Sequence, residues 1–265
     1  MLLASSARRL ARPLSRPLCS SVWSRQPNVP SQLAAKLEAA VGQSLAVRSD
    51  LATSLAASWR VEPIGEPAPF QDGAGKAWAF TLRMGEGTDL GLLRAAHWQA
   101  DRAGDVATAM LFAPQCHPAL PLSVAAVPLI DAACAAMREQ GAERITAVAA
   151  LPGLCDWVCE TRAWESEAMT EEQSGAVEAV ARGEPRPGHS VLGVGTFKAA
   201  QAAFQPLALA YASRDHPDAE CSAFRAAGAT LMGVHWMHST TPDALRDSAG
   251  CTASFEFPHV PTDSS

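Results

Sequence analysis

Apolar residues recur along this chain either every three to four positions or in short continuous runs. The first spacing is typical of helices with one buried face, and the second of buried strands. Residues 31–59 show the helical spacing, with Gly42 and Ser49-Asp50 as candidate breaks. With capping residues as a further guide, helices are predicted over residues 88–102, 123–140, 154–161, 170–182, 197–212 and 218–227, and from 241 onward.

Short runs of small, β-branched and aromatic residues lie between these helices and predict strands. The runs cover residues 78–82, 107–112, 144–151, 230–236 and 251–257. Residues 62–76 and 183–195 are rich in Pro and Gly, and we expect them to be loops. Strands that alternate with helices are typical of an α/β layered domain.

The composition fits an enzyme-sized globular protein. Of the 265 residues, 48% are hydrophobic, which excludes a disordered or collagen-like chain. The 21 Lys and Arg residues against 27 Asp and Glu residues give a net charge of −6, so we expect no nucleic-acid partner. The seven cysteines are too few, and odd in number, for a disulfide scaffold.

The first 35 residues contain five arginines, many serines and no acidic residue. Leu3, Leu10 and Leu14 lie near one helix face, and arginines follow another. This pattern is typical of an organelle transit peptide, which we predict over residues 1–30, with a disordered basic tail as the alternative. The density of arginines favours the mitochondrial matrix, with a plastid as the alternative.

Residues 106–130 carry no charge and are numerous enough to span a bilayer. Four prolines interrupt the stretch, however. Each proline removes a backbone donor that lipid cannot replace. No transmembrane segment is predicted.

Two pairs of residues have spacings that raise the question of a metal site. Cys155 and Cys159 are four residues apart on a predicted helix, but zinc would need two further ligands, so core cysteines are favoured. His235 and His238 flank Trp236-Met237 at the end of a predicted strand and are three residues apart. Because such residues point to opposite faces, we do not expect them to share a metal, and no metal site is predicted.

Other candidate motifs are incomplete. Gly193-Val194-Gly195 lacks the third glycine and the preceding strand of a dinucleotide-binding loop. Cys116 and His117 are adjacent, so their side chains diverge on a strand, whereas a nucleophile and its base must touch. Ser190 and Ser248 have no motif of their own. These residues alone do not identify a reaction.

Two stretches together resemble the C-terminal catalytic domain of the malonyl-CoA decarboxylase family. The family has a strand, a Cys-Gln-x-Gly-Leu turn, a Gly-Asn-Phe-Leu-Ile helix start and Ser-Pro-Ile-Pro-Gly-Phe followed by a tryptophan; here the matching segments are residues 109–112, 116–120, Leu129-Ile130 and 145–157. It then has a tyrosine-bearing helix, Phe-His-x-x-Asn-Gly-Ala, a tryptophan, Ser-Pro and Leu-Arg-x-Ser-Ala-Gly; here these match residues 207–211, Gly228-Ala229, Trp236, Thr241-Pro242 and 245–250. Order and spacing agree over roughly residues 105–160 and 204–256.

The chain departs from the family at the positions that carry its chemistry. By the resemblance, the catalytic serine falls on Ala149 and its following proline on Ala150. The catalytic histidine falls on Phe224, and the asparagine before Gly-Ala on Ala227. Decarboxylation leaves an enolate that needs a hydrogen-bond donor and a proton, and neither alanine nor phenylalanine supplies one. His235 and His238 are the weak surrogates that the sequence offers, with Cys221 as a further one.

The resemblance also implies a binding loop for the CoA phosphates. It falls on Ser123, Val124, Ala125 and Ala126, and the family's glycines fall on Leu122 and Ala126. Glycine allows backbone N–H groups to approach a phosphate closely, so a leucine there hinders binding.

The fold that the resemblance implies is a mixed central sheet flanked by helices, similar to the acyl-CoA N-acyltransferase fold. We expect a transit peptide over residues 1–30, a short helical segment over 31–62 and the decarboxylase-like domain over 63–265. The resemblance implies a larger helical N-terminal domain, which we expect to be mostly missing here.

The resemblance implies a relative of malonyl-CoA decarboxylase, whose reaction converts malonyl-CoA to acetyl-CoA and CO₂, with impaired or lost catalysis. The alternative is a non-catalytic regulatory or binding subunit that pairs with an active paralogue or with itself. A third hypothesis is an unrelated α/β protein. No cofactor is expected, and a CoA ester is the expected ligand.

Overall fold

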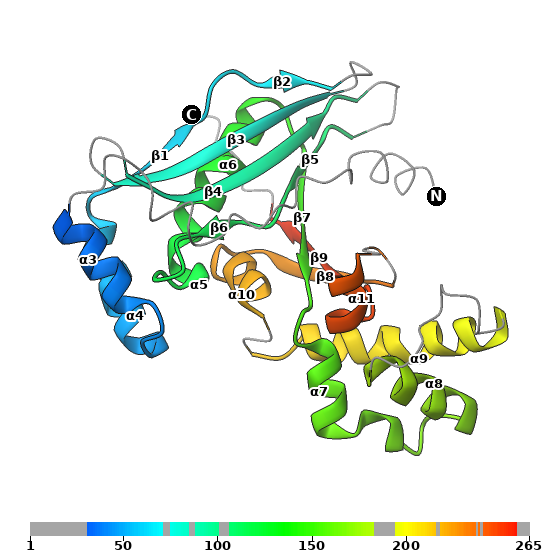
Figure 1. The fold of residues 1–265 in the computed structure, drawn as a ribbon. Coiled ribbons are helices and arrows are strands. Elements are labelled where there is room, and N and C mark those ends of the chain that lie inside the picture. Colours follow the sequence, from blue (N-terminus) through cyan, green and yellow to red (C-terminus); the bar gives the residue numbers. More distant parts are fainter. Residues whose placement is uncertain are drawn as a thin grey trace.

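The computed structural model describes residues 31–70, 75–84, 88–100, 106–182, 194–215, 218–236, 238 and 241–258. The transit peptide predicted over residues 1–30 lies outside these residues. The described part centres on one mixed sheet of nine strands (Figure 1). Its strands run in the order β1 (Trp59–Pro63), β3 (Gly75–Met84), β4 (Thr88–Trp98), β5 (Thr108–Leu111), β7 (Arg144–Ala150), β9 (Thr252–Phe257) and β8 (Thr230–His235), with β2 (Ala68–Pro69) on β3 and β6 (Gln115–Cys116) on β4.

Helices flank this sheet, as the α/β pattern predicts (Figure 1). The helices are α3 (Ser31–Ala40), α4 (Leu45–Ala56), α5 (Leu122–Ala125), α6 (Val127–Glu139), α7 (Leu154–Thr161), α8 (Glu171–Ala181), α9 (Val194–Ala212), α10 (Ala219–Ala226) and α11 (Pro242–Ser248), with one 3₁₀ turn at Ala163–Glu165. Helix α6 packs on β1, β3, β4 and β5, and α10 packs on β7. The expected mixed sheet flanked by helices is confirmed.

The core lies between the sheet and helices α6 and α10. Along β7 and β9, alternate side chains are buried, as the two-residue period of a strand requires. Phe224 of α10 lies 5.7 Å from Phe255 and 6.2 Å from Phe257, measured between ring centroids. These aromatic contacts fix α10 against the part of β9 that pairs with Ile145 and Ala147 of β7.

Strand β4 replaces the helix predicted over residues 88–102. Leucine, alanine and arginine favour a helix there by intrinsic propensity. Instead, residues 88–98 pair with β3 over the whole strand and with β5 and β6 on the other side. Gly91 lies where an added Cβ would crowd Cys116 and Leu129, so this position serves strand packing rather than a helix.

The helix predicted over residues 123–140 is divided in two. Helix α5 ends at Ala125 and α6 begins at Val127. Pro128 lies in the first turn of α6, where its missing N–H costs nothing. Gly141 ends α6 with φ +86°, as predicted. The helical segment expected over residues 31–62 is helical to Ala56 and then enters the sheet as β1.

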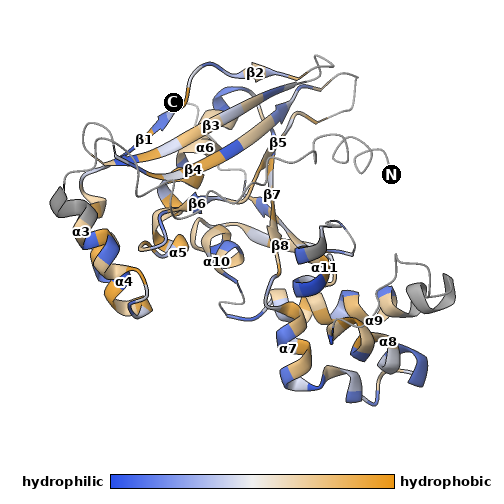
Figure 2. Cartoon of the chain, viewed as in Figure 1, coloured by the Kyte–Doolittle hydropathy of each residue, from blue (hydrophilic) through white to orange (hydrophobic). Residues whose placement is uncertain are grey.

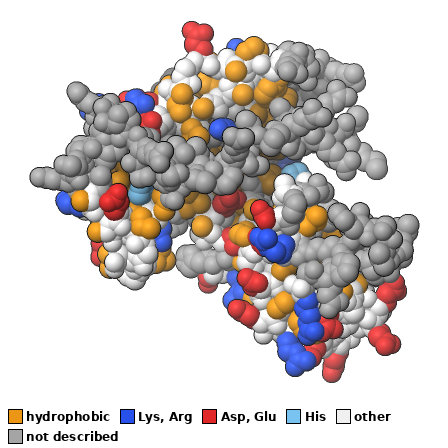
Figure 3. All heavy atoms as spheres, viewed as in Figure 1, with side chains coloured by type: hydrophobic (Ala, Val, Ile, Leu, Met, Phe, Trp, Pro, Cys, Tyr) orange, Lys and Arg blue, Asp and Glu red, His pale blue; other side chains and the backbone are white. Residues whose placement is uncertain are grey.

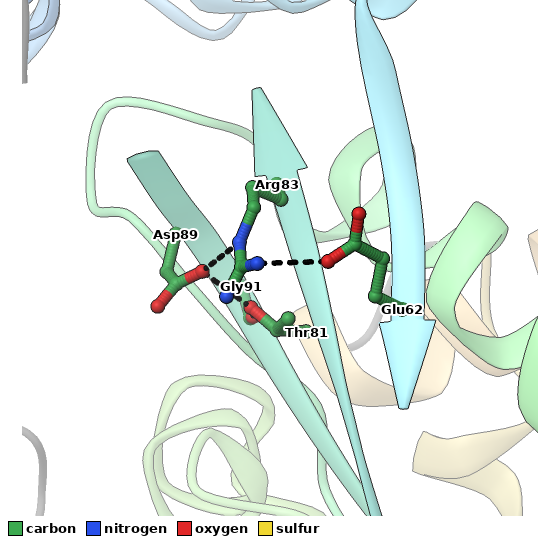
Figure 4. Close-up of polar contacts among 5 residues, drawn as sticks. All are labelled: Glu62, Thr81, Arg83, Asp89 and Gly91. Carbon is green, nitrogen blue, oxygen red and sulfur yellow. Dashed lines mark hydrogen bonds and ion pairs between the residues drawn. The ribbon is translucent and has the colours of Figure 1, made fainter. Parts of the chain in front are cut away.

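A network of polar side chains joins β1, β3 and β4 on one face of the sheet (Figure 4). Arg83 contacts Glu62 at 2.8 Å and Asp89 at 2.9 Å. The Thr81 hydroxyl contacts the Asp89 carboxylate at 3.0 Å and the Gly91 carbonyl at 3.2 Å. These side chains are half-exposed except for Thr81, so the network fixes strand register more than it adds stability.

Hydrophilic and hydrophobic residues are mixed along the described elements (Figure 2). Within the described residues, no helix is long and apolar enough to cross a membrane. On the face shown in Figure 3, acidic and basic side chains are interspersed over the helices α7 and α8.

Candidate active site

The carboxyl ends of β5, β7 and β8 lie at one end of the sheet, together with the start of β9, which runs in the opposite direction. Strands β5 and β7 are parallel, and they pair only from Thr108 with Arg144 to Leu111 with Ala147. Strand β7 continues to Ala150, paired there with Thr252 of β9, which in turn pairs with His235 of β8. Ligands of open α/β sheets bind outside the carboxyl ends of strands. We call this region, from Ala150 through Thr252 to His235 with the first turn of α10, the strand-end site.

Ala149 and Phe224, on which the resemblance places the family's catalytic residues, lie on the face of the sheet opposite Ala150, Thr252 and His235 and carry apolar side chains. Ala149 is fully buried on β7, opposite Ala253. Phe224 is fully buried on α10, against Phe255 and Phe257. Neither residue can donate or accept a proton, so any proton transfer in this site depends on other residues.

The first turn of α10 holds two carboxylates against the backbone that follows β7. Glu220 accepts a hydrogen bond from the Ala150 N–H at 2.9 Å, and Asp218 accepts one from the Gly153 N–H at 3.3 Å. Burial raises the pKa of both carboxyl groups, although these hydrogen bonds oppose the shift. The two carboxylates therefore attach α10 to the segment between β7 and α7.

Tyr211, at the end of α9, joins Asp218 and Glu220 in a polar cluster, which we call the acidic group. Its hydroxyl hydrogen bonds to Asp218, and its ring lies 5.5 Å from the Trp157 ring. Burial and then the neighbouring Asp218 charge raise the pKa of Tyr211, so its hydroxyl stays protonated. A Cβ added to Gly153 would overlap the Tyr211 hydroxyl. Glycine at 153 therefore allows this contact.

His235 and His238 lie closer together than the strand pattern predicts. Strand β8 ends at His235, so the chain turns before His238 and the alternation of faces no longer applies. The two ring centroids are 6.0 Å apart, with the rings inclined by 44°. The expectation that these side chains point apart is therefore wrong. Among the described residues, however, no three His, Cys, Asp or Glu side chains form a group that could hold a metal.

Thr252 lies between β7 and β8 in this row of strand ends. Its side chain is only 5% exposed, and its hydroxyl has no hydrogen-bond partner among the described residues. Cross-strand partners place their side chains on the same face of a sheet, so Thr252 shares a face with His235 and Ala150. The site thus brings a hydroxyl and an imidazole to one face.

The predicted phosphate-binding residues form the short helix α5 and the residue after it. Ala125 and Ala126 are fully buried, and Ser123 and Val124 are half-buried. Helix α5 packs against α10, which places the predicted loop beside the strand-end site. The Val124 and Ala125 N–H groups donate to the Pro121 carbonyl, so a phosphate would have to reach other N–H groups of this turn.

Arg48 of α4 supports the segment that leads into α5. Its guanidinium donates to the Pro118 carbonyl at 2.6 Å and to the Ala119 carbonyl at 3.3 Å. The helical pair α3 and α4 is thereby connected to the predicted phosphate-binding turn.

Cys116 and His117 do not form a nucleophile pair. Burial raises the pKa of the Cys116 thiol to about 12, so it remains a thiol at neutral pH. His117 Nδ1 accepts a hydrogen bond from the Ala119 N–H at 3.2 Å, and burial lowers the pKa of His117. Both residues support the turn before α5.

The remaining candidates have structural roles or lie outside the described residues. Cys155 is buried on α7, and Cys159, one turn later, is half-buried with a raised pKa. The Ser248 hydroxyl donates to the Ala244 carbonyl at 2.8 Å within α11. Ser190 and Gly193 lie outside the described residues.

The sequence did not predict the roles of Asp218, Glu220, Tyr211 and Thr252. Asp218 was expected only as the start of a helix, and Glu220 belongs to no motif. Their importance comes from the packing of α10 on β7, which joins residues some 70 apart in sequence. An acidic pair in the first turn of a short helix was the available signal, and it is equally typical of ordinary helix capping.

Comparisons with known proteins agree with the fold. No protein-family profile matches the sequence, and no curated protein matches it. The structure is similar to malonyl-CoA decarboxylase from Rhodopseudomonas palustris, with a TM-score of 0.58 and 12% identity over 85% of this chain. It is also similar to malonyl-CoA decarboxylase from Cupriavidus metallidurans, with a TM-score of 0.54 and 13% identity over 80% of this chain. The chain spans 64% of the length of each. These likenesses show the fold and support a distant relationship.

Proposed function

We propose that this chain is a CoA-ester-binding relative of malonyl-CoA decarboxylase with impaired catalysis, acting in acyl-CoA metabolism. The observation that carries the proposal is the likeness to two malonyl-CoA decarboxylases over 80–85% of this chain. Ala149 and Phe224 at the family's catalytic positions support impaired catalysis, because both side chains are inert and buried. The family reaction is the conversion of malonyl-CoA to acetyl-CoA and CO₂.

The CoA ester would lie at the strand-end site. Beyond Leu111 and Ala147, β5 and β7 no longer pair. The Ala150 N–H is bonded to Glu220 and the Phe112 N–H to Arg94, so a ligand would use other backbone groups of this stretch or displace Glu220. The pantetheine arm of CoA contains two amides, which can bond to such groups as an added strand does. Helix α5 lies beside α10, where the resemblance expects the phosphates, on Ser123, Val124, Ala125 and Ala126.

The proposal includes the assignment of this sheet to the acyl-CoA N-acyltransferase fold. A sheet with one parallel pair, β5 and β7, among antiparallel neighbours supports the acyl-CoA N-acyltransferase fold. A crystal structure of the full chain with CoA bound would test it. Density for CoA outside the ends of β5 and β7 is expected, and density elsewhere would reject the assignment.

A titration of the full chain with CoA, acetyl-CoA and malonyl-CoA tests the proposed function. Ligand at 100 times its Kd stabilises the folded state by about 2.7 kcal/mol, which thermal unfolding detects. We expect a concentration-dependent rise in Tm with CoA esters and a smaller rise with adenosine phosphates of equal charge that lack the pantetheine arm. No rise with any CoA ester would reject the proposal.

The second candidate function is a non-catalytic subunit that pairs with an active paralogue or with itself. The inert residues at positions 149 and 224 favour it. Purification of the chain from its native organelle, followed by mass spectrometry, would test it. A stoichiometric complex with a second decarboxylase-like chain is expected under this function, and recovery of a free monomer would reject it.

The mitochondrial matrix remains the proposed location, on the basis of the Arg-rich first 30 residues. Import of a reporter fused to residues 1–30 by isolated mitochondria, but not by plastids, is the expected result. Import by plastids alone would favour the alternative.

A further inference from the structure

The strand-end site has a row of three residues on adjacent strands that share one face. Ala150 pairs with Thr252, and Thr252 pairs with His235. Because directly opposite residues point to the same face and strands lie about 4.8 Å apart, His235 is roughly 10 Å from Ala150. His235 is solvent-exposed, so a ligand that extends from β7 across β9 can reach its ring.

Thr252 is the unusual member of this row. Its hydroxyl is buried and has no hydrogen-bond partner among the described residues. A buried polar group without a partner costs about 1–3 kcal/mol, so an apolar residue of the same shape, such as valine, would be favoured by stability alone. The cross-strand partner on its face is His235. A small rotation of the imidazole would let the hydroxyl bind one ring nitrogen and leave the other nitrogen toward the ligand.

Decarboxylation of a malonyl thioester needs a proton donor beside the α-carbon. The bond between the α-carbon and the carboxylate breaks, CO₂ leaves, and the electron pair passes into the thioester enolate. The α-carbon must then take a proton to give the acetyl thioester. Ala149 and Phe224 cannot supply it, whereas an imidazolium can, and it regains a proton from water.

We propose that His235 donates this proton and that Thr252 positions its ring, with the malonyl group on the face of Ala150, Thr252 and His235. Ala149 and Phe224 are buried on the opposite face of the sheet. This inference rests on the proposed function, since it requires a CoA ester at the strand-end site. It differs from that function in assigning a residual, slow decarboxylation to named residues of this chain. Glu220, which bonds to the Ala150 N–H, is the rival proton donor.

The test is malonyl-CoA turnover by the full-length chain, followed as acetyl-CoA. His235→Gln is expected to lower kcat at least 10-fold with little change in KM, because general acid help contributes about 10²–10⁴-fold. Added imidazole should restore activity to His235→Ala, which a purely structural role would not produce. Thr252→Val should lower kcat, and Thr252→Ser should retain it. Met232→Gln, an exposed change on the same strand, is the matched control and should leave kcat unchanged.

Two outcomes overturn the inference. The first is a wild-type chain that binds malonyl-CoA in the thermal titration but forms no acetyl-CoA, which leaves the binding function intact. The second is full activity in His235→Gln, above all if Glu220→Gln is inactive. Absence of CoA-ester binding would instead reject the proposed function itself.

Discussion

Single side chains decide what the contact between α10 and β7 can do. Ala149 and Phe224 make it an apolar packing surface. Asp218, Glu220 and Tyr211 make the neighbouring turn a hydrogen-bonded connection. The same contact therefore combines an inert core with polar groups at its edge.

Substitution of Gly153 tests whether its backbone lies against the Tyr211 hydroxyl. Gly153→Ala places a Cβ where the Tyr211 hydroxyl lies, and overpacking of this kind costs about 1–3 kcal/mol. The double variant with Tyr211→Phe removes the obstructing oxygen and should recover part of the loss. Urea unfolding of the two single variants and the double variant measures this. Additive losses in the double variant would mean that the two groups do not touch.

Glu220 predicts a pH dependence of stability. Its pKa is raised in the fold by burial, so the unfolded state loses its proton first as pH rises. Stability is therefore lost as pH rises from the ordinary glutamate value of 4.5 through the folded pKa. Glu220→Gln keeps an acceptor for the Ala150 N–H without the charge, so its advantage over wild type should widen between pH 4.5 and 8. A constant difference in urea unfolding across this range would show that burial does not shift the carboxyl group.

At the level of elements, local pattern identified most helices and the central strands. Helix α8 begins at the start of the predicted helix 170–182, where Thr170 and Gln173 form a capping box. The short helix α7 spans the predicted residues 154–161. These segments carry their signals within one or two turns, so sequence alone is sufficient for them.

The elements that sequence did not identify depend on distant partners. Strand β4 has helical propensity, and its pairing with β3, β5 and β6 overrides that preference. Strands β1, β2 and β6 are short pieces of the sheet within segments that were expected to be helix end or loop. The strand-end site was missed for the same reason, since it joins β7, β8, β9 and α10.

Helix α10 gives a prediction at this scale. Phe224→Ala should destabilise the protein by about 3–5 kcal/mol, because it empties a core position between Phe255 and Phe257. Phe224→His, which introduces the residue that the resemblance expects here, should also destabilise, because it buries an imidazole among aromatic rings. It should not raise malonyl-CoA turnover. A gain of turnover with unchanged stability would mean that this side chain faces the ligand rather than the core.

At the scale of the whole molecule, the described residues have a fold similar to that of two malonyl-CoA decarboxylases, and the resemblance places Ala149 and Phe224 at that family's catalytic positions. The chain spans 64% of the two similar decarboxylases, and its sheet still brings the ends of β5, β7 and β8 together. A fold can outlast its chemistry, because packing and catalysis depend on different side chains. The proposed CoA-ester binding therefore depends on backbone geometry more than on the replaced residues.

Amide hydrogen exchange of the full chain, with and without malonyl-CoA, tests this account most directly. It reports, residue by residue, where a ligand slows opening of the backbone. We expect added protection at residues 112–126, 148–153, 218–222, 234–235 and 252–253, with little change in β1, β2 and α8. Protection confined to other segments, or none at a malonyl-CoA concentration that raises Tm, would contradict the placement of the ligand at the strand-end site.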